Sequence, residues 1–232
     1  MTGRHIVSLF MISLILLINQ TGFGAEARQP SIKLLDNFYD FGFVPIDYKL
    51  IHTFQIRNDG QAGLVINKLV PNCDCTHAQV MDTLVAPDSI TTIKILFDTK
   101  NYYGPSTRHI TVHSNDPDNP AVELEYASAI GMVPRYFKVE PQSLFYLPGH
   151  KSKKITLINL SEDKLKYDLE IEPGSLFTVN KTSGEIDSRD STILDVQPLE
   201  SLPRGTHYSN FTVNFGDKSD ARLTVPVKIV RY

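Results

Sequence analysis

The chain has 232 residues and a net charge of −3 at pH 7, so it has no broad basic field that would attract nucleic acid or anionic lipid. Apolar residues make up 41% of the chain and charged residues 21%, which is typical of a globular protein and not of a disordered one. The length allows one large domain or two domains of about 100 residues each. Composition therefore makes nucleic acid an unexpected partner and leaves the domain count to the sequence pattern.

The first 27 residues have the pattern of a secretory signal peptide. Arg4 and His5 precede an apolar run over residues 6–18, and Ala-Glu-Ala at 25–27 supplies the small-x-small site that signal peptidase cleaves. The run is short for a membrane span, which needs about 20 residues. We therefore expect a periplasmic or secreted protein that meets the membrane only transiently, through its signal peptide. An uncleaved anchor is the alternative.

After the signal peptide, apolar and polar residues alternate with a period of two, which indicates β-strands. One such run covers residues 49–57, and Asn58-Asp59-Gly60 follows it. Because Asp-Gly tolerates positive φ angles, this tripeptide predicts a hairpin whose return strand covers residues 64–70. Further strands are expected over 90–97, 109–113 and 121–130, the last two paired with each other. No window keeps a period of 3.6 residues, so helix is expected to be a minor element.

The same order of signals recurs 101 positions later in the chain. Asn58 and Asn159 end corresponding alternating runs, and Gly104 and Gly205 precede another corresponding pair. A constant spacing in early and late strands indicates tandem copies of one domain.

Short strands separated by turn signals, about seven in each 100 residues, are typical of an immunoglobulin-like sandwich. The tryptophan of antibody domains is absent, so the likeness is to the architecture alone. The sequence predicts an all-β protein with two tandem immunoglobulin-like β-sandwich domains. They cover residues 28–132 and 133–232 and follow the signal peptide at 1–27.

The only two cysteines of the chain, Cys73 and Cys75, lie in the first copy. The equivalent positions of the second copy hold Gly174 and Leu176. Thiols are therefore not required to fold the repeated unit, and this favours a role that is specific to the first copy.

The chemistry available to the cysteines depends on the backbone between them. On an extended strand Cys73, Cys75 and His77 share one face, and the cysteine Cα atoms lie about 7 Å apart, at the limit for a disulfide. That geometry predicts a metal site, with Cu(I) or Zn(II) as the suitable ions. If Asn72 and Asp74 bend the segment, a small-ring and easily reduced disulfide forms instead. A structural disulfide or an inert pair of thiols is the third alternative.

Other candidates for chemistry are weaker. His52 and Met81 are the candidates for a fourth metal ligand. His109 and His113 share a strand face without carboxylates at matching spacing, and the loop that contains Asp116 is explained by turn formation. No nucleophile elbow or phosphate-binding glycine loop is present, so we do not expect an enzyme.

Several motifs of the first copy resemble, in order, the bacterial exported family called domain of unknown function 1573. They are Phe41-Gly42, Arg57-Asn58-Asp59-Gly60, Pro71-x-Cys73-x-Cys75-Thr76, Ala86-Pro87-Asp88-Ser89 and Ser114-Asn115-Asp116-Pro117. The resemblance covers about residues 32 to 131 and implies export and an immunoglobulin-like fold related to domains of ciliary and spindle proteins. It implies no established activity. One departure is Asp74, which stands where the family usually has glycine.

Two functional hypotheses follow. The first, which we favour, is a non-catalytic module that binds a protein partner of the cell envelope through loops or an exposed strand edge. The second is a thiol site for copper handling or disulfide exchange at Cys73 and Cys75, with His77 as helper. Apart from copper or zinc at these three residues, no cofactor is expected.

Overall fold

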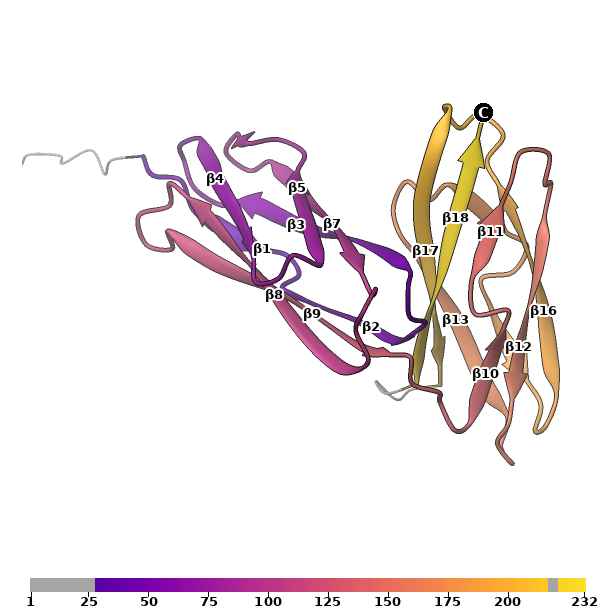
Figure 1. Cartoon of the computed structure of the whole chain (residues 1–232). Helices are drawn as coiled ribbons and strands as arrows, with labels where there is room; N and C mark the ends of the chain where they lie inside the picture. Colours follow the sequence, from indigo (N-terminus) through magenta and orange to yellow (C-terminus); the bar gives the residue numbers. More distant parts are fainter. Residues whose placement is uncertain (1–27, 217–220) are drawn as a thin grey trace, which may run out of the picture.

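The structure, a computed structural model, describes residues 28–216 and 221–232, and these residues form two β-sandwiches (Figure 1). The predicted signal peptide, residues 1–27, lies outside the described residues. Within the described part, no helix has the length and apolar character needed to cross a bilayer. The predicted fold class, an all-β protein with two tandem immunoglobulin-like sandwiches, is confirmed.

Two facing sheets make up the first sandwich. Its strands are β1 (Ile32–Leu34), β2 (Phe38–Val44), β3 (Lys49–Asn58), β4 (Leu64–Pro71), β5 (Thr76–Val80), β6 (Leu84–Val85), β7 (Ile90–Asp98), β8 (Gly104–Ser114) and β9 (Ala121–Ile130). One sheet has the order β1-β3-β7-β5, and β2, β9, β8, β4 and β6 follow one another in the other. The core between them contains the fully buried Phe41, Phe54, Phe97 and Tyr126. Alternation of inward apolar residues in each strand therefore builds one core from both sheets.

The second sandwich repeats this plan. Its strands are β10 (Phe137–Glu140), β11 (Leu144–Tyr146), β12 (Lys153–Asn159), β13 (Leu165–Ile171), β14 (Phe177–Val179), β15 (Ser183–Ile186), β16 (Ser191–Pro198), β17 (Gly205–Phe215) and β18 (Arg222–Arg231). One sheet has the order β10-β12-β16-β14, which matches β1-β3-β7-β5 strand for strand. Ile32 pairs with Asn58 and Phe137 pairs with Asn159, so even the register at the first strand recurs.

The hairpin predicted across Asn58-Asp59-Gly60 is wrong. β3 pairs with β1 and β7, whereas β4 pairs with β6 and β8 in the facing sheet. Asn58 is fully buried, and its amide donates to the carbonyls of Ala62 (2.7 Å) and Val85 (2.9 Å) while its Oδ1 accepts from Gly60 N–H (3.0 Å). The asparagine therefore holds the chain while it crosses between sheets, and a tight two-strand turn does not form. Asn159, also fully buried, holds the equivalent crossing of the second sandwich through Asp163 and Ile186.

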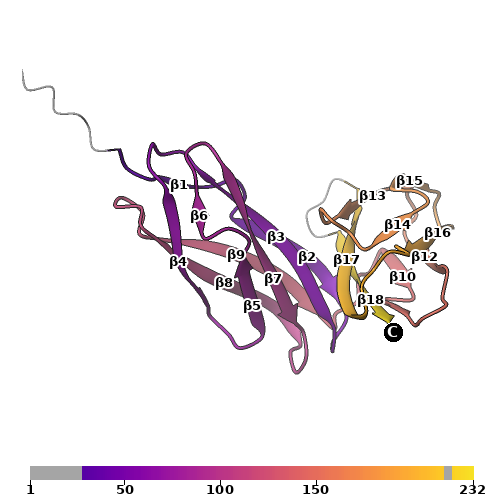
Figure 2. The ribbon, with the colours of Figure 1, turned by 90° about the horizontal axis from the view of Figure 1, so that it is seen from above.

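The two sandwiches share one ten-stranded sheet, in which β18 of the second lies beside β2 of the first (Figures 1 and 2). The pairing of β2 with β9 shifts between Asp40 and Phe43, and Gly42, which lies in this bulge, pairs with Leu223 of β18 instead. Gly42 has a φ of +64°, and its N–H donates to Asp40 Oδ1 at 2.7 Å. A Cβ at this position would lie 2.2 Å from the carbonyl oxygen of Arg222. Only glycine allows the two backbones to approach this closely.

Buried side chains of the second sandwich reinforce this junction. Thr224 donates from its hydroxyl to the carbonyl of Phe41 at 2.6 Å, and Asn210 Oδ1 accepts from the N–H of Ile51 at 2.6 Å. Thr224 and Asn210 are almost completely buried, so neither group exchanges its partner for water. The hydrogen bonds across the junction thus join buried side chains of the second sandwich to backbone groups of the first.

Replacing Gly42 by alanine tests the shared sheet, with Gly174→Ala as its matched control. Gly174 has a similar φ of +72°, but a Cβ there meets nothing within 4 Å. Both variants lose about 1–2 kcal/mol from the left-handed backbone. Gly42→Ala loses more, because its Cβ meets Arg222. We expect a larger fall in the unfolding midpoint for Gly42→Ala than for Gly174→Ala, and faster proteolysis between the sandwiches for Gly42→Ala alone. Equal losses in the two variants would contradict the proposed role of the glycine.

A buried carboxylate ties the start of β1 to the loop between β8 and β9. Asp116 is 2% exposed and accepts from the N–H groups of Ile32 (2.8 Å), Asp118 (2.9 Å) and Asn119 (3.2 Å). Burial by itself would raise the pKa of Asp116, but the three backbone donors outweigh it and lower the pKa below the usual 3.8. The turn role expected for Asp116 is therefore observed.

The lowered pKa of Asp116 makes part of the stability depend on pH. Its contribution is complete above 3.8, the ordinary pKa, and is lost as the pH falls through the lower pKa of the folded state. We expect Asp116→Asn to destabilise the chain by about 1–3 kcal/mol at neutral pH. The difference from wild type should shrink on acidification below 3.8. Urea unfolding of both proteins across this range measures it, and a difference that does not change with pH would count against the assignment.

Candidate functional site

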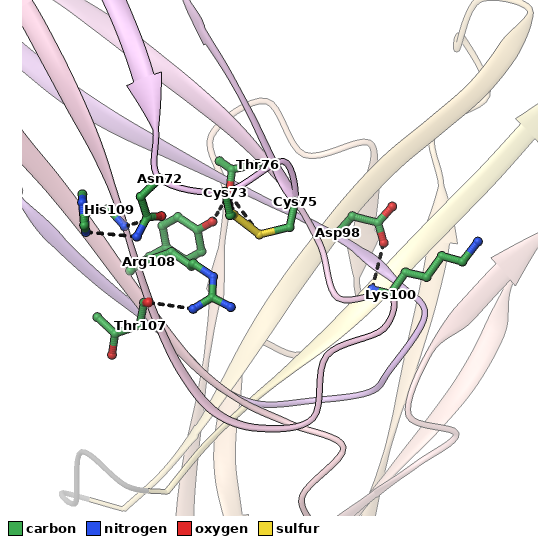
Figure 3. The surroundings of a disulfide bond; sticks show 10 residues. Asn72, Cys73, Cys75, Thr76, Asp98, Lys100, Thr107, Arg108 and His109 are labelled. Atoms are coloured by element: carbon green, nitrogen blue, oxygen red, sulfur yellow. Dashed lines mark hydrogen bonds between the residues drawn. A yellow bond between two sulfur atoms is a disulfide. The ribbon is translucent and has the colours of Figure 1, made fainter.

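Cys73 and Cys75 form a disulfide in the turn between β4 and β5 (Figure 3). Their Cα atoms lie 5.2 Å apart, and Thr76 N–H donates to the carbonyl of Cys73 at 3.4 Å. The segment is therefore bent, as the sequence allowed through Asn72 and Asp74, and it is not the extended strand on which a shared metal was favoured. Which of the remaining roles the cystine has depends on its surroundings.

The hydroxyl group of Thr76 lies against the two sulfur atoms. Thr76 Oγ1 is 3.3 Å from Cys73 Sγ and 3.8 Å from Cys75 Sγ, and it is hydrogen-bonded to the hydroxyl of Tyr126. Burial raises the pKa of Tyr126 to about 12, so this phenol keeps its proton at neutral pH. Sequence reasoning missed both residues. Thr76 follows the second cysteine in the motif, so the sequence could have indicated it. Tyr126 belongs to β9, and only the fold brings it to Thr76.

His77 does not face the sulfur atoms. It follows Thr76 on β5 and is exposed, whereas Thr76 is buried against the cystine, and successive side chains of a strand point to opposite faces. His52, a candidate fourth ligand, instead bonds Glu172 Oε1 across the junction at 2.6 Å, and Met81 is 75% exposed.

The described residues contain no cluster of three His, Cys, Asp or Glu side chains suited to a metal ion. Both sulfur atoms are joined to each other in the disulfide. A copper or zinc site at Cys73, Cys75 and His77 therefore stays a prediction for the reduced chain, because only free thiolates bind these ions.

β5 has one side that pairs with no described strand. Met81 N–H donates to Thr92 in line with β7, and Asp98 N–H donates to the carbonyl of Cys75. Cys75 and Met81 thus form hydrogen bonds with β7, and so does every second residue between them. Because the bonding direction alternates along a strand, Ala78 and Val80 turn their N–H and C=O groups to the free side. Four backbone groups are thus available for a further strand.

The other edge strands are less open than β5, which has five residues and no Lys, Arg, Asp or Glu. The edge strands β6, β11 and β14 have two or three residues. The remaining edges carry charged residues: Lys33 on β1, Lys138 and Glu140 on β10, and Glu185 on β15. Short length and charge are the devices by which proteins prevent strand addition at an edge. Among the described strands, β5 is the edge that combines the greatest length with no such charge.

An apolar hollow of about 500 Å³ lies beside the junction of the two sandwiches. Ile46, Tyr103, Met132 and Val133 contribute to its lining, and Tyr103 is 79% exposed. The lining, which is drawn from the described residues, includes no carboxylate, imidazole, amine or thiol. The hollow therefore has the chemistry of a contact surface.

Comparison with known families supports the resemblance read from the motifs. Residues 32–128, which lie in the first sandwich, match the family described as "Protein of unknown function (DUF1573)". No curated protein sequence matches the chain.

Solved structures with a related strand arrangement come from distant organisms. A protein of unknown function from Porphyromonas gingivalis W83 has 10% identity and a TM-score of 0.36, over 86% of this chain and 99% of its own. The PapD-like domain 7 of human CEP192 has 14% identity and a TM-score of 0.33, over 42% and 87%. The Caenorhabditis elegans MSP family member WR4 has 14% identity and a TM-score of 0.34, over 43% and 100%. At these scores the likeness adds no argument about function.

The cystine closes a very small loop, and its removal should affect stability little. Residues two positions apart in the sequence are linked, for which loop-closure entropy gives about 1–2 kcal/mol. We expect the double variant Cys73→Ser, Cys75→Ser to fold and to lose about that much in urea unfolding. Failure of the variant to fold would show that the cystine is a structural requirement of the first sandwich.

Proposed function

We propose that this chain is an exported, non-catalytic binding module whose first sandwich accepts an extended segment of another cell-envelope protein along β5. The observation that carries the proposal is the free side of β5, a five-residue edge without charge. An incoming strand gains main-chain hydrogen bonds at such an edge and places alternate side chains against the sheet. The cystine next to β5 supports export, because disulfides persist in oxidising compartments.

The expected affinity is moderate. The N–H and C=O groups of Ala78 and Val80 supply four hydrogen bonds, each worth about 1 kcal/mol net. Side chains of the bound segment would add contacts with the exposed His77 and Gln79 on the outer face. Specificity would thus come from His77 and Gln79, and the backbone would supply a recognition that is independent of sequence.

Proline at Ala78 tests strand addition directly. It removes an N–H that points to the free side and leaves the hydrogen bonds to β7 in place. Val179 is the matched control, because it occupies the same position on β14, the edge strand of the second sandwich. With a photo-crosslinking amino acid at Gln79, we expect wild type and Val179→Pro to capture the same envelope protein in cells and Ala78→Pro to lose it.

Two further measurements complete this test. Thermal unfolding must show that Ala78→Pro and Val179→Pro keep similar stabilities, so that loss of capture reports on the edge. The double variant Cys73→Ser, Cys75→Ser should keep its capture, because the edge needs no thiol. Undiminished crosslinking by a folded Ala78→Pro chain would refute binding along β5.

A further inference from the structure

We propose that the Cys73–Cys75 cystine is a thiol–disulfide exchange site that oxidises a pair of thiols on another exported protein. This inference goes beyond the proposed binding function and does not require it. It is carried by the unequal exposure of the two cysteines and by the Thr76 hydroxyl group that lies against both sulfur atoms.

The second sandwich shows that the turn forms without a cystine. Gly174 and Leu176 occupy the positions of the two cysteines, and Ser175 N–H donates to the carbonyl of Glu172 at 3.1 Å to close the turn there. β14 then begins at Phe177, in the place where β5 begins at Thr76. The second sandwich thus makes the equivalent connection with a different hydrogen bond and without cysteines, so a disulfide is not needed to join the two strands.

The two cysteines differ in exposure. Cys75 is 7% exposed and belongs to the core of the first sandwich, whereas Cys73 is only partly buried. An incoming thiolate therefore reaches Cys73 first, and Cys75 is the leaving group. This order is set by burial and is independent of the identity of the attacking protein.

The leaving thiolate of Cys75 has a hydrogen-bond donor in place. Thr76 Oγ1 lies within contact of both sulfur atoms and is bonded in turn to the Tyr126 hydroxyl. Either hydroxyl can donate in this bond, and when Tyr126 donates, the Thr76 proton is free to turn toward a sulfur anion. Burial raises the pKa of Tyr126, and the positive charge of Arg108 partly opposes this effect.

The exchange takes place in two displacements. A partner thiolate attacks Cys73 Sγ, the Cys73–Cys75 bond breaks, and Cys75 leaves with the electron pair as a thiolate. A second partner thiolate then attacks the partner sulfur of the mixed disulfide and releases Cys73. The partner dithiol is oxidised to a disulfide, this chain is reduced by two electrons, and the two protons lost by the partner thiols are taken up by Cys73 and Cys75 or by water.

Equilibration of the full mature chain with glutathione redox buffers tests the site, with the reduced fraction read by thiol alkylation and mass spectrometry. We expect glutathione to reduce the cystine in a folded protein, because structural disulfides resist the glutathione pool and exchange sites do not. The single variants should differ. Oxidised glutathione should modify Cys73 in Cys75→Ser at least about tenfold faster than Cys75 in Cys73→Ser, because burial hinders the second.

A second variant pair isolates the hydroxyl group. Thr76→Val should slow reduction by glutathione about tenfold, since the leaving thiolate loses its donor. Thr91→Val, which removes another buried hydroxyl of the same sandwich, bonded to Asp82, should leave the rate unchanged. A cystine that stays oxidised, equal reactivity of the two single variants, or an unchanged rate in Thr76→Val would each overturn the proposal. The crosslinking experiment with Ala78→Pro tests the binding function independently of these measurements.

Discussion

The close approach of two backbones at Gly42 is the constraint on which the arrangement of this protein depends. A bulge in β2 turns this residue away from β9 and toward Leu223 of β18, so two sandwiches that each have a complete core also share a sheet. A side chain at Gly42 would collide with the carbonyl of Arg222. The position of the second sandwich relative to the first is thus set by backbone geometry, and buried side chains such as Thr224 then add hydrogen bonds across the junction.

The two candidate sites lie at neighbouring positions of the first sandwich, and their requirements differ. Strand addition uses backbone groups of β5 and needs only that the edge stay free. Disulfide exchange uses Cys73 and Cys75, which immediately precede β5, together with the buried pair Thr76 and Tyr126. The two proposals therefore concern adjacent segments of the chain and can be tested independently of each other.

The duplication explains which features serve the fold and which are specific to the first sandwich. Asn58 and Asn159 are buried in both copies and bond equivalent carbonyls, so they belong to the fold of the repeated unit. The cystine and the long uncharged edge strand occur in the first copy alone, where the second has Gly174, Leu176 and a three-residue β14. Differences between copies that fold alike are where a specific function is to be sought.

From the sequence alone, the period-two alternation and the spacing of 101 determined the all-β class and the doubled sandwich, because local side-chain pattern decides which face of a strand is buried. The motif around Cys73 also led to the family that the first sandwich matches. Tertiary structure alone decided the rest. Asn58 ends β3 and holds a crossing between sheets in place of a hairpin, since its partners include Val85, far along the chain. Tyr126 reaches Thr76, and β5 is left at an edge, through long-range strand order that no local pattern encodes.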